Sequence, residues 1–292
     1  VKKHAESLDS INYIYVVSRH HHLLGVFSMK ELLRARPEQK AEDIMVREVH
    51  KVHPYTHQER AAYLALTYSI KAIPVVEKDG KFLGVVASDA LLKVMHHEAS
   101  EDLLRLAGVR HRESINDNVL TLSIFRSIRH RLPWLFFGLA GGLLAAGVIS
   151  SFEVILRQNL VLAAFIPLIV YMSDAVGTQL EAFIIRDFAL IGKLPIRSYI
   201  SRHFAVVTAM ACILSGSVWL GSYIFYGDMK VSAVIAFALF LATESSLVTG
   251  LFIPYGFRKL TLDPANASGP IATIMQDLFS VTIYLLIATW LL

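Results

Sequence analysis

Asp277 is an acidic residue inside residues 268–292, a stretch of about 25 residues that is otherwise apolar enough to cross a bilayer. A carboxylate at that depth costs several kcal/mol unless it faces protein, water or a cation. Asp174 and Glu244 lie inside two other apolar stretches, and no basic residue lies there to pair with them. Three acids without a buried base indicate a path for cations, and they argue against an anion channel.

Composition divides the chain into a polar N-terminal module and an apolar membrane module. The whole chain is 54% hydrophobic and 18% charged, with a mean hydropathy of +0.51, whereas about a quarter of a soluble domain is charged. Only eight acidic and nine basic residues lie in 131–292, against 16 and 19 in the first 130 residues. The net charge of +4 is modest, so we expect no nucleic-acid partner.

The polar module contains an internal repeat. The order strand, turn, strand, helix occurs at 11–34 and returns at 72–95. The segment YIYVVSRHHHLLGVFSMKELL is echoed by AIPVVEKDGKFLGVVASDALL. The period of about 60 residues indicates a pair of domains rather than a solenoid.

The second copy opens with AEDIMVREV and closes with IPVVEKDGKFLGVVASDALL, and both segments resemble a cystathionine-β-synthase-type (CBS) domain. We therefore expect an α+β CBS pair, with a partial first domain at 1–36 and a second domain at 41–97. The chain opens with Val1 rather than Met, so it reads as a piece of a longer protein.

The CBS resemblance implies a ligand for this pair, either an adenosine nucleotide or, in some transporters, a divalent ion. The family pattern places Ser or Thr three residues after a strand glycine and an acid three residues later. Gly25, Ser28 and Glu31 match that pattern, so Ser28 and Glu31 are the candidate nucleotide contacts. The equivalent positions of the second copy are Gly84, Ala87 and Ala90. The alternative is a pair that serves only as a dimerisation platform.

Residues 98–131 connect the two modules. They end in an amphipathic run that carries Arg126, Arg129 and Arg131. We expect a connecting, plug-type helix along the cytoplasmic membrane surface, where it could transmit a change in the CBS pair to the membrane module.

Residues 132–292 form the expected five-span cation-transport domain. Its apolar segments are 132–151, 160–185, 203–226, 231–255 and 268–292. Basic residues precede the first span and fill the second and fourth connections, so the positive-inside rule predicts a cytoplasmic N-terminus and an external C-terminus. Glycines that could permit close helix packing are Gly138, Gly141, Gly142, Gly216 and Gly221.

Polar side chains recur at helical spacing inside the spans. In the fifth span the predicted polar face carries Thr273, Asp277, Ser280 and Tyr284. In the second span Asp174 and Glu181 share a face. Hard oxygen ligands without thiolate or imidazole suit Mg²⁺, Ca²⁺ or Mn²⁺, and a hydrated Mg²⁺ binds through a few carboxylates.

Three segments resemble the MgtE family of magnesium channels: LDPANASGPIATIMQD at 262–277, RLPW at 131–134, and EDLLRLAGV at 101–109. The resemblance implies a homodimer of five-span subunits with the ion path along the dimer axis. It also implies cytoplasmic domains that close the pore when magnesium is plentiful. The family's last-span aspartate matches Asp277. Of its second-span motif, Pro167, Gly177 and Gln179 match, while Ser173-Asp174-Ala175 replaces Gly-Gly-Asn and adds a carboxylate.

The function expected from these observations is transport of a divalent cation, with Mg²⁺ favoured, by a multi-pass protein of the cell membrane. The candidate cation ligands are Asp277, Asp174, Thr273, Gln179, Glu244, Asp263 and Glu181. Three of them have other readings. Glu244 could be a protonated packing residue, Asp263 could cap the last helix, and Glu181 could pair with Arg186. The expected partners are the cation, membrane lipid and a second copy of the chain.

Two alternatives stay open. An exchanger driven by Na⁺ or H⁺ could use Asp174 and Glu244 as proton carriers. An intramembrane metalloprotease with CBS domains would need an HExxH motif inside a span, and the only histidine of the membrane module is His203. We therefore expect a transporter and not an enzyme.

Overall fold

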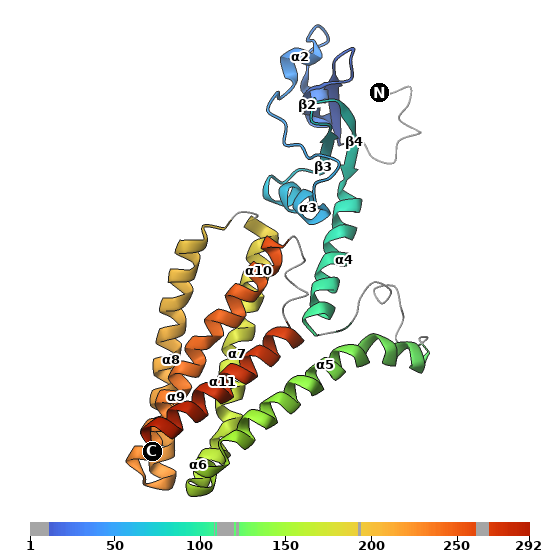
Figure 1. Cartoon of the computed structure of the whole chain (residues 1–292). Coiled ribbons are helices and arrows are strands. Elements are labelled where there is room, and N and C mark those ends of the chain that lie inside the picture. The colour runs from blue at the N-terminus through green and yellow to red at the C-terminus, as the bar shows by residue number, and fades with distance from the viewer. Residues whose placement is uncertain (1–11, 108, 110–119, 121–122, 192–193, 261–268) are drawn as a thin grey trace. The chain divides into compact units, whose positions relative to one another are not determined.

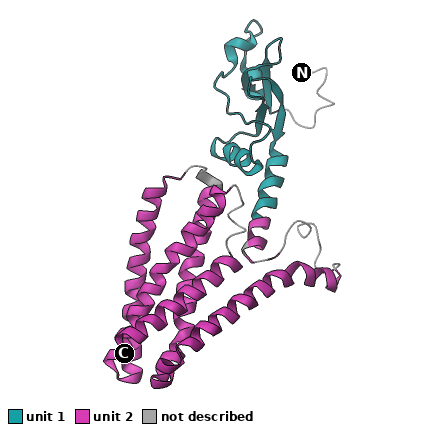
Figure 2. Ribbon diagram, viewed as in Figure 1, with its two compact units in different colours: residues 1–99 teal, residues 100–292 magenta. Residues whose placement is uncertain are grey.

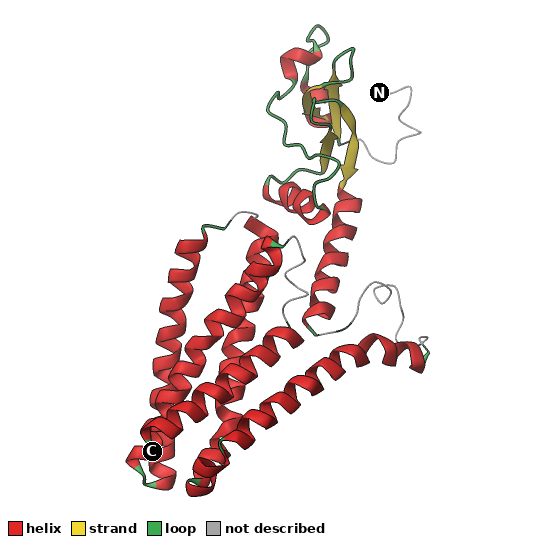
Figure 3. Cartoon of the chain, viewed as in Figure 1, coloured by secondary structure: helices red, strands yellow, loops and turns green. Residues whose placement is uncertain are grey.

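The computed structural model describes residues 12–107, 109, 120, 123–191, 194–260 and 269–292 (Figure 1). The chain forms two compact units, residues 1–99 and 100–292 (Figure 2). Within the described residues, strands belong only to the first unit, and the second unit is helical (Figure 3). This arrangement confirms the expected fold class, an α+β CBS region followed by a helical membrane module.

The first unit is built on two antiparallel strand pairs, each with short helices nearby. The strands are β1 (Tyr13–Val17), β2 (Leu23–Ser28), β3 (Ala72–Val76) and β4 (Phe82–Ala87). The helices are α1 (Met29–Arg34), α2 (Ala41–Ile44), α3 (Gln58–Thr67) and α4 (Ser88–Leu106). Ile73 and Val76 are fully buried, and α3 packs close to them because its inner face presents alanines.

The internal repeat of the sequence is also visible in the strand register. In β1–β2, Val16 pairs with Gly25 and the register then shifts at the next residue. In β3–β4, Val75 pairs with Gly84 and the register shifts at the same point. An equivalent bulge in each pair bends the two ladders alike. The internal repeat is therefore present in the structure as well as in the sequence.

The second unit contains five helices that are long and apolar enough to cross a membrane, as expected. Its elements are α5 (Ile124–Ser151), α6 (Glu153–Gln158), α7 (Leu160–Ile191), α8 (Ile196–Tyr226), α9 (Met229–Leu247), the π-helical turn η2 (Val248–Phe252), α10 (Ile253–Lys259) and α11 (Pro270–Leu291). α9 is the most buried of the five spans, and its apolar side chains share a core with those of α7 and α11.

Two helix ends differ from the sequence expectation. α5 begins at Ile124 and runs without a break through Pro133, so residues 131 and 132 do not mark a helix boundary. Arg126, Arg129 and Arg131 therefore lie in the first turns of α5 rather than in a separate helix. α4 in turn continues past residue 97 to Leu106. Most of the segment between these two helices lies outside the described residues.

Of the five glycines predicted to permit close helix packing, one makes a close contact within the described chain. A Cβ on Gly141 would lie 2.5 Å from Ile274 of α11, so a side chain there would separate α5 from α11. No atom lies within 4 Å of the equivalent point, in the described part of the chain, for the other four predicted glycines: Gly138, Gly142, Gly216 and Gly221.

A second close helix contact of the second unit was not predicted. It occurs at η2, where α9 widens into a π-helical turn before α10. Pro254 of α10 has no N–H, so it cannot donate the hydrogen bond that an unbroken α-helix would send to the carbonyl of Gly250. Gly250 packs against α7: a Cβ on Gly250 would lie 2.7 Å from the carbonyl oxygen of Gly177.

Candidate cation site

Asp174 of α7 and Asp277 of α11 face each other across the seam between these two helices. The hydroxyl of Thr273, one turn before Asp277, hydrogen-bonds the Asp174 carboxyl group. The two aspartates are close enough for their negative charges to repel each other. Both are half-buried, so neither side chain is enclosed by this chain alone. The structure thus brings together three of the predicted ligands from two spans.

Glu181 extends this row of carboxylates along α7. It lies two turns from Asp174, is only 5% exposed, and feels the negative charge of Asp174. Its Oε2 accepts a hydrogen bond of 3.4 Å from the backbone N–H of Gly269, just before α11. The expected alternative partner, Arg186, instead forms an ion pair of 2.8 Å with Asp187.

Three predicted ligands are not part of this seam in the described structure. Gln179 is exposed and lies about 140° around α7 from Asp174. Glu244 lies on α9, where both carboxylate oxygens are buried and have no hydrogen-bond partner among the described residues. Asp263 lies outside the described residues.

The polar face predicted for the last span is divided by the fold. Thr273 and Asp277 face Asp174, but Ser280 and Tyr284 are fully buried among the helices. The hydroxyl of Tyr284 donates a hydrogen bond of 2.8 Å to the carbonyl of Leu162 on α7. All four side chains thus contact α7, as expected for one polar face, but only Thr273 and Asp277 lie beside Asp174.

Sequence analysis also missed a buried polar residue beside the site. Gln276 is 1% exposed and hydrogen-bonds to α9 and η2. The sequence feature that could have identified Gln276 is an uncharged amide directly before Asp277 in an apolar segment.

The chemistry of the seam suits a hard cation. Its donors are carboxylates and one hydroxyl, and neither sulfur nor imidazole is among them. Mg²⁺ keeps several of its waters and binds through one or two carboxylates, whereas Ca²⁺ takes six to eight oxygens. Asp174 is repelled by both Asp277 and Glu181, and a divalent ion bound beside these carboxylates would offset that repulsion.

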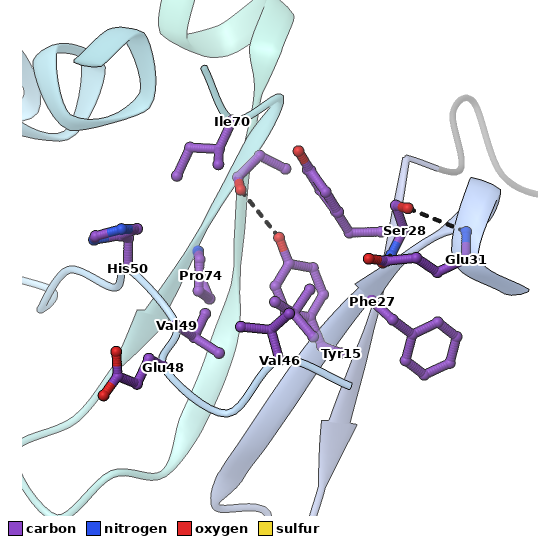
Figure 4. Close-up of a pocket in the computed structure, with 13 residues that line it drawn as sticks. Tyr15, Phe27, Ser28, Glu31, Val46, Glu48, Val49, His50, Ile70 and Pro74 are labelled. Atoms are coloured by element: carbon purple, nitrogen blue, oxygen red, sulfur yellow. Dashed lines mark hydrogen bonds between the residues drawn. The ribbon is translucent and has the colours of Figure 1, made fainter. Parts of the chain in front are cut away.

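The first unit contains a cavity of about 350 Å³. Aromatic and apolar side chains line most of it, including Tyr15, Phe27, Val46 and Pro74, with the carboxylates of Glu31 and Glu48 at its edge (Figure 4). The Tyr15 hydroxyl donates a hydrogen bond of 3.1 Å to the carbonyl of Ala72, which joins the two strand pairs. Burial, with a smaller contribution from Tyr13, raises the pKa of Tyr15 to about 12, so the hydroxyl stays neutral and keeps its proton.

Ser28 and Glu31, the predicted nucleotide contacts, both line this cavity and hydrogen-bond each other (Figure 4). They form a capping box at the start of α1. The backbone N–H of Ser28 donates to Glu31 Oε2 at 2.6 Å, and the N–H of Glu31 donates to the Ser28 hydroxyl at 3.3 Å. This arrangement occupies one oxygen of Glu31 and leaves Oε1 for another partner.

Comparison with known proteins identifies relatives of this chain. A family model described as a divalent cation transporter, MgtE, matches residues 166–287, which include the whole seam. The chain is 35% identical over 291 residues to the magnesium transporter MgtE of Bacillus subtilis (strain 168), covering 99% of this chain and 63% of that protein. The chain belongs to the MgtE family. It is a multi-pass membrane protein, and the relatives that it matches are named magnesium transporters.

A second relative, a CBS domain model and a solved structure also match parts of this chain. The magnesium transporter MgtE of Enterococcus faecalis (strain ATCC 700802 / V583) is 32% identical over 297 residues, covering 99% of this chain and 63% of that protein. A CBS domain model matches residues 41–97. The solved cytosolic domain of the Mg²⁺ channel MgtE in complex with ATP is 35% identical, covers 32% of this chain and 38% of that chain, and has a TM-score of 0.31. The chain thus spans somewhat less than two thirds of the length of its two MgtE relatives.

Proposed function

We propose that this protein transports divalent cations, with Mg²⁺ as the favoured cargo, along a path lined by Asp174 and Asp277. The observation that carries the proposal is the pair of carboxylates that face each other across α7 and α11 inside the membrane. Charges at that depth are tolerated where they serve an ion path. The MgtE relatives are named magnesium transporters, which supports Mg²⁺ as cargo.

A second copy of the chain completes the path in this proposal. Thr178 and Gln179 are exposed on α7, in a span whose residues are mostly apolar. An amide that faced lipid would lack hydrogen-bond partners. This face of α7 is therefore expected to meet water or the partner subunit. A homodimer would double the carboxylates around an axis, which suits a partly hydrated divalent ion.

The proposed orientation has the CBS region in the cytoplasm and the C-terminus outside. Arg126, Arg129 and Arg131 precede the apolar part of α5, and Arg258 and Lys259 end α10. Positive residues beside these span ends favour the cytoplasmic side of the cell membrane.

A coupled exchanger is the second candidate, and Glu244 favours it. Both of its carboxylate oxygens are buried without a partner among the described residues. A buried carboxylate without a partner is strongly disfavoured, so a monovalent cation bound at Glu244 would relieve it. Transport driven by Na⁺ or H⁺ would give this residue a role.

The proposal is tested by divalent-cation flux into proteoliposomes that contain the purified protein. We expect Mg²⁺ uptake above that of protein-free vesicles, compared with Ca²⁺, Mn²⁺ and Co²⁺, without a Na⁺ or H⁺ gradient. Uptake that requires such a gradient would replace the passive path by the exchanger. No divalent uptake under either condition would reject both.

We further propose that the cavity of the first unit binds an adenosine nucleotide and gates the path. Tyr13, Tyr15 and Phe27 offer surfaces for a base, and Glu31 Oε1 suits a ribose hydroxyl. Occupancy would bias the connecting segment toward closure of the path.

Val46→Trp is expected to block this cavity. Val46 lines the cavity, its side chain is 51% exposed, and its backbone hydrogen-bonds to Val26, so a larger side chain fills space without breaking the fold. Calorimetric titration with ATP and with adenosine should show binding to the wild type and at least about tenfold weaker binding to the variant, a loss of roughly 1.4 kcal/mol. Equal binding to both proteins would contradict the assignment.

A further inference from the structure

Each aspartate of the seam follows a buried polar residue. Ser173 precedes Asp174 on α7, and Gln276 precedes Asp277 on α11; Ser173 is 0% exposed and Gln276 1% exposed. Neighbouring residues of an α-helix point about 100° apart. Each helix therefore presents its acid to the seam and the residue before it to the interior of the bundle.

These interior side chains form one hydrogen-bonded chain. Gln276 Oε1 accepts a hydrogen bond of 2.5 Å from the hydroxyl of Thr249 in η2. Gln276 Nε2 lies 3.1 Å from the hydroxyl of Ser280 and 3.2 Å from the carbonyl of Ala242. The hydroxyls of Ser280 and Ser173 are 2.6 Å apart. We call Ser173, Thr249, Gln276 and Ser280 the polar clamp; it links α7, η2 and α11.

The clamp lies beside Gly177, in direct contact with α7. A Cβ on Gly177 would lie 3.6 Å from the hydroxyl oxygen of Thr249 and 4.0 Å from Cγ of Gln276. A buried amide that loses its partners retains the full penalty of its desolvation. Rotation of α11 would break several of these bonds at once, and its separation from α7 would break the bond between Ser280 and Ser173. The clamp therefore restricts both the rotation of α11 and its distance from α7.

We propose that the polar clamp determines cation specificity by fixing the separation of Asp174 and Asp277, with Gln276 as the central positioning residue. The inference rests on the proposed transport function and deepens it. Mg²⁺ demands near-octahedral geometry and retains its waters, while the larger Ca²⁺ accepts flexible, irregular ligand sets. A rigid carboxylate spacing favours the stricter ion, and a loosened spacing admits the more permissive one.

The test compares two substitutions on α11. Gln276→Met keeps the length of the side chain and removes the amide from the clamp. Tyr284→Phe is the matched control, because it deletes one hydrogen bond between α11 and α7, to the Leu162 carbonyl, two turns away from Asp277. Initial Mg²⁺ and Ca²⁺ fluxes are measured in proteoliposomes over a range of concentrations.

We expect Gln276→Met to lower the Mg²⁺/Ca²⁺ flux ratio several-fold and to raise the KM for Mg²⁺, while Tyr284→Phe leaves the ratio at the wild-type value. Ser280→Ala, which removes the middle link, should lower the ratio as well, and Ser280→Thr, which keeps the hydroxyl, should restore it. These serine variants keep the test decisive if the Gln276 variant does not assemble. A wild-type ratio in both Gln276→Met and Ser280→Ala would overturn the inference, as would an equal change in Tyr284→Phe.

A binding readout separates this inference from the proposed function. Mn²⁺ bound to the purified protein is measured by electron paramagnetic resonance. If the wild type binds Mn²⁺ but carries no divalent flux, the transport proposal fails, and weaker Mn²⁺ binding in Gln276→Met but not in Tyr284→Phe still supports the clamp. If Mn²⁺ binds equally to all three proteins, the clamp is rejected. If the wild type binds no Mn²⁺, there is no ion for the clamp to select, and it is rejected too.

Discussion

Asp277→Asn is expected to reduce Mg²⁺ flux to the level of protein-free vesicles. Asparagine keeps the shape of the side chain and removes its negative charge, so the seam keeps its packing but loses half of the negative charge with which its two aspartates attract a cation. The same change removes the repulsion between Asp277 and Asp174. We therefore expect the thermal unfolding temperature without divalent ions to stay equal or to rise, while the stabilisation by added Mg²⁺ is lost.

Asp228→Asn provides the matched control, because it is the same chemical change outside the seam. Asp228 caps the start of α9 by accepting hydrogen bonds from the N–H groups of Lys230 and Val231 at 2.9 and 3.0 Å. Asparagine is an equally good cap, so fold and flux should be unchanged. Normal flux in Asp277→Asn would remove this residue from the ion path. A loss in both variants would mean that any acid-to-amide change disturbs the protein.

The fold was largely predictable because its two signals are strong. Long apolar runs identify spans, and the repeated strand–turn–strand pattern identifies the CBS region. The helix ends were predicted wrongly where polar residues are part of a helix. Arg126, Arg129 and Arg131 lower the hydropathy of 124–131, yet arginine is a good helix former, so α5 begins well before its apolar part. Hydropathy also carries no information on helix pitch, and the π-helical turn at Val248–Phe252 was therefore not predicted.

The acidic residues of the candidate site could be predicted from the sequence. The buried side chains that hydrogen-bond beside them could not. Asp174, Thr273 and Asp277 were identified because a charged or polar side chain inside a span is costly unless it has a polar or ionic partner. Helical spacing placed Ser280 with them, but spacing describes one helix and cannot show which neighbour covers which side. Ser280 turns toward Ser173 because α7 lies against that side of α11. Gln276 was missed for the same reason, since its partners lie on α9 and η2.

The contact between Gly250 and Gly177 leads to the second large prediction. Gly250→Ala is expected to destabilise the second unit and to impair flux. The added Cβ would lie 2.7 Å from the Gly177 carbonyl oxygen and 2.7 Å from Cβ of Leu180. Real Cβ atoms do not approach backbone that closely, so α7 and η2 must separate. Overpacking of this kind costs about 1–3 kcal/mol, and the displaced carbonyl lies one turn from Asp174.

Gly256→Ala is the control for this prediction. Gly256 lies on α10, one and a half turns further along the same span, and a Cβ there meets no atom of the described chain within 4 Å. Alanine in a helix is favoured over glycine by about 1 kcal/mol, so this variant should unfold at the wild-type temperature or above it and keep its flux. Thermal unfolding in detergent and Mg²⁺ flux are measured for both. If Gly250→Ala matched Gly256→Ala, α7 and η2 would tolerate separation, and the clamp that joins them through Thr249 could not hold the two aspartates at a fixed distance.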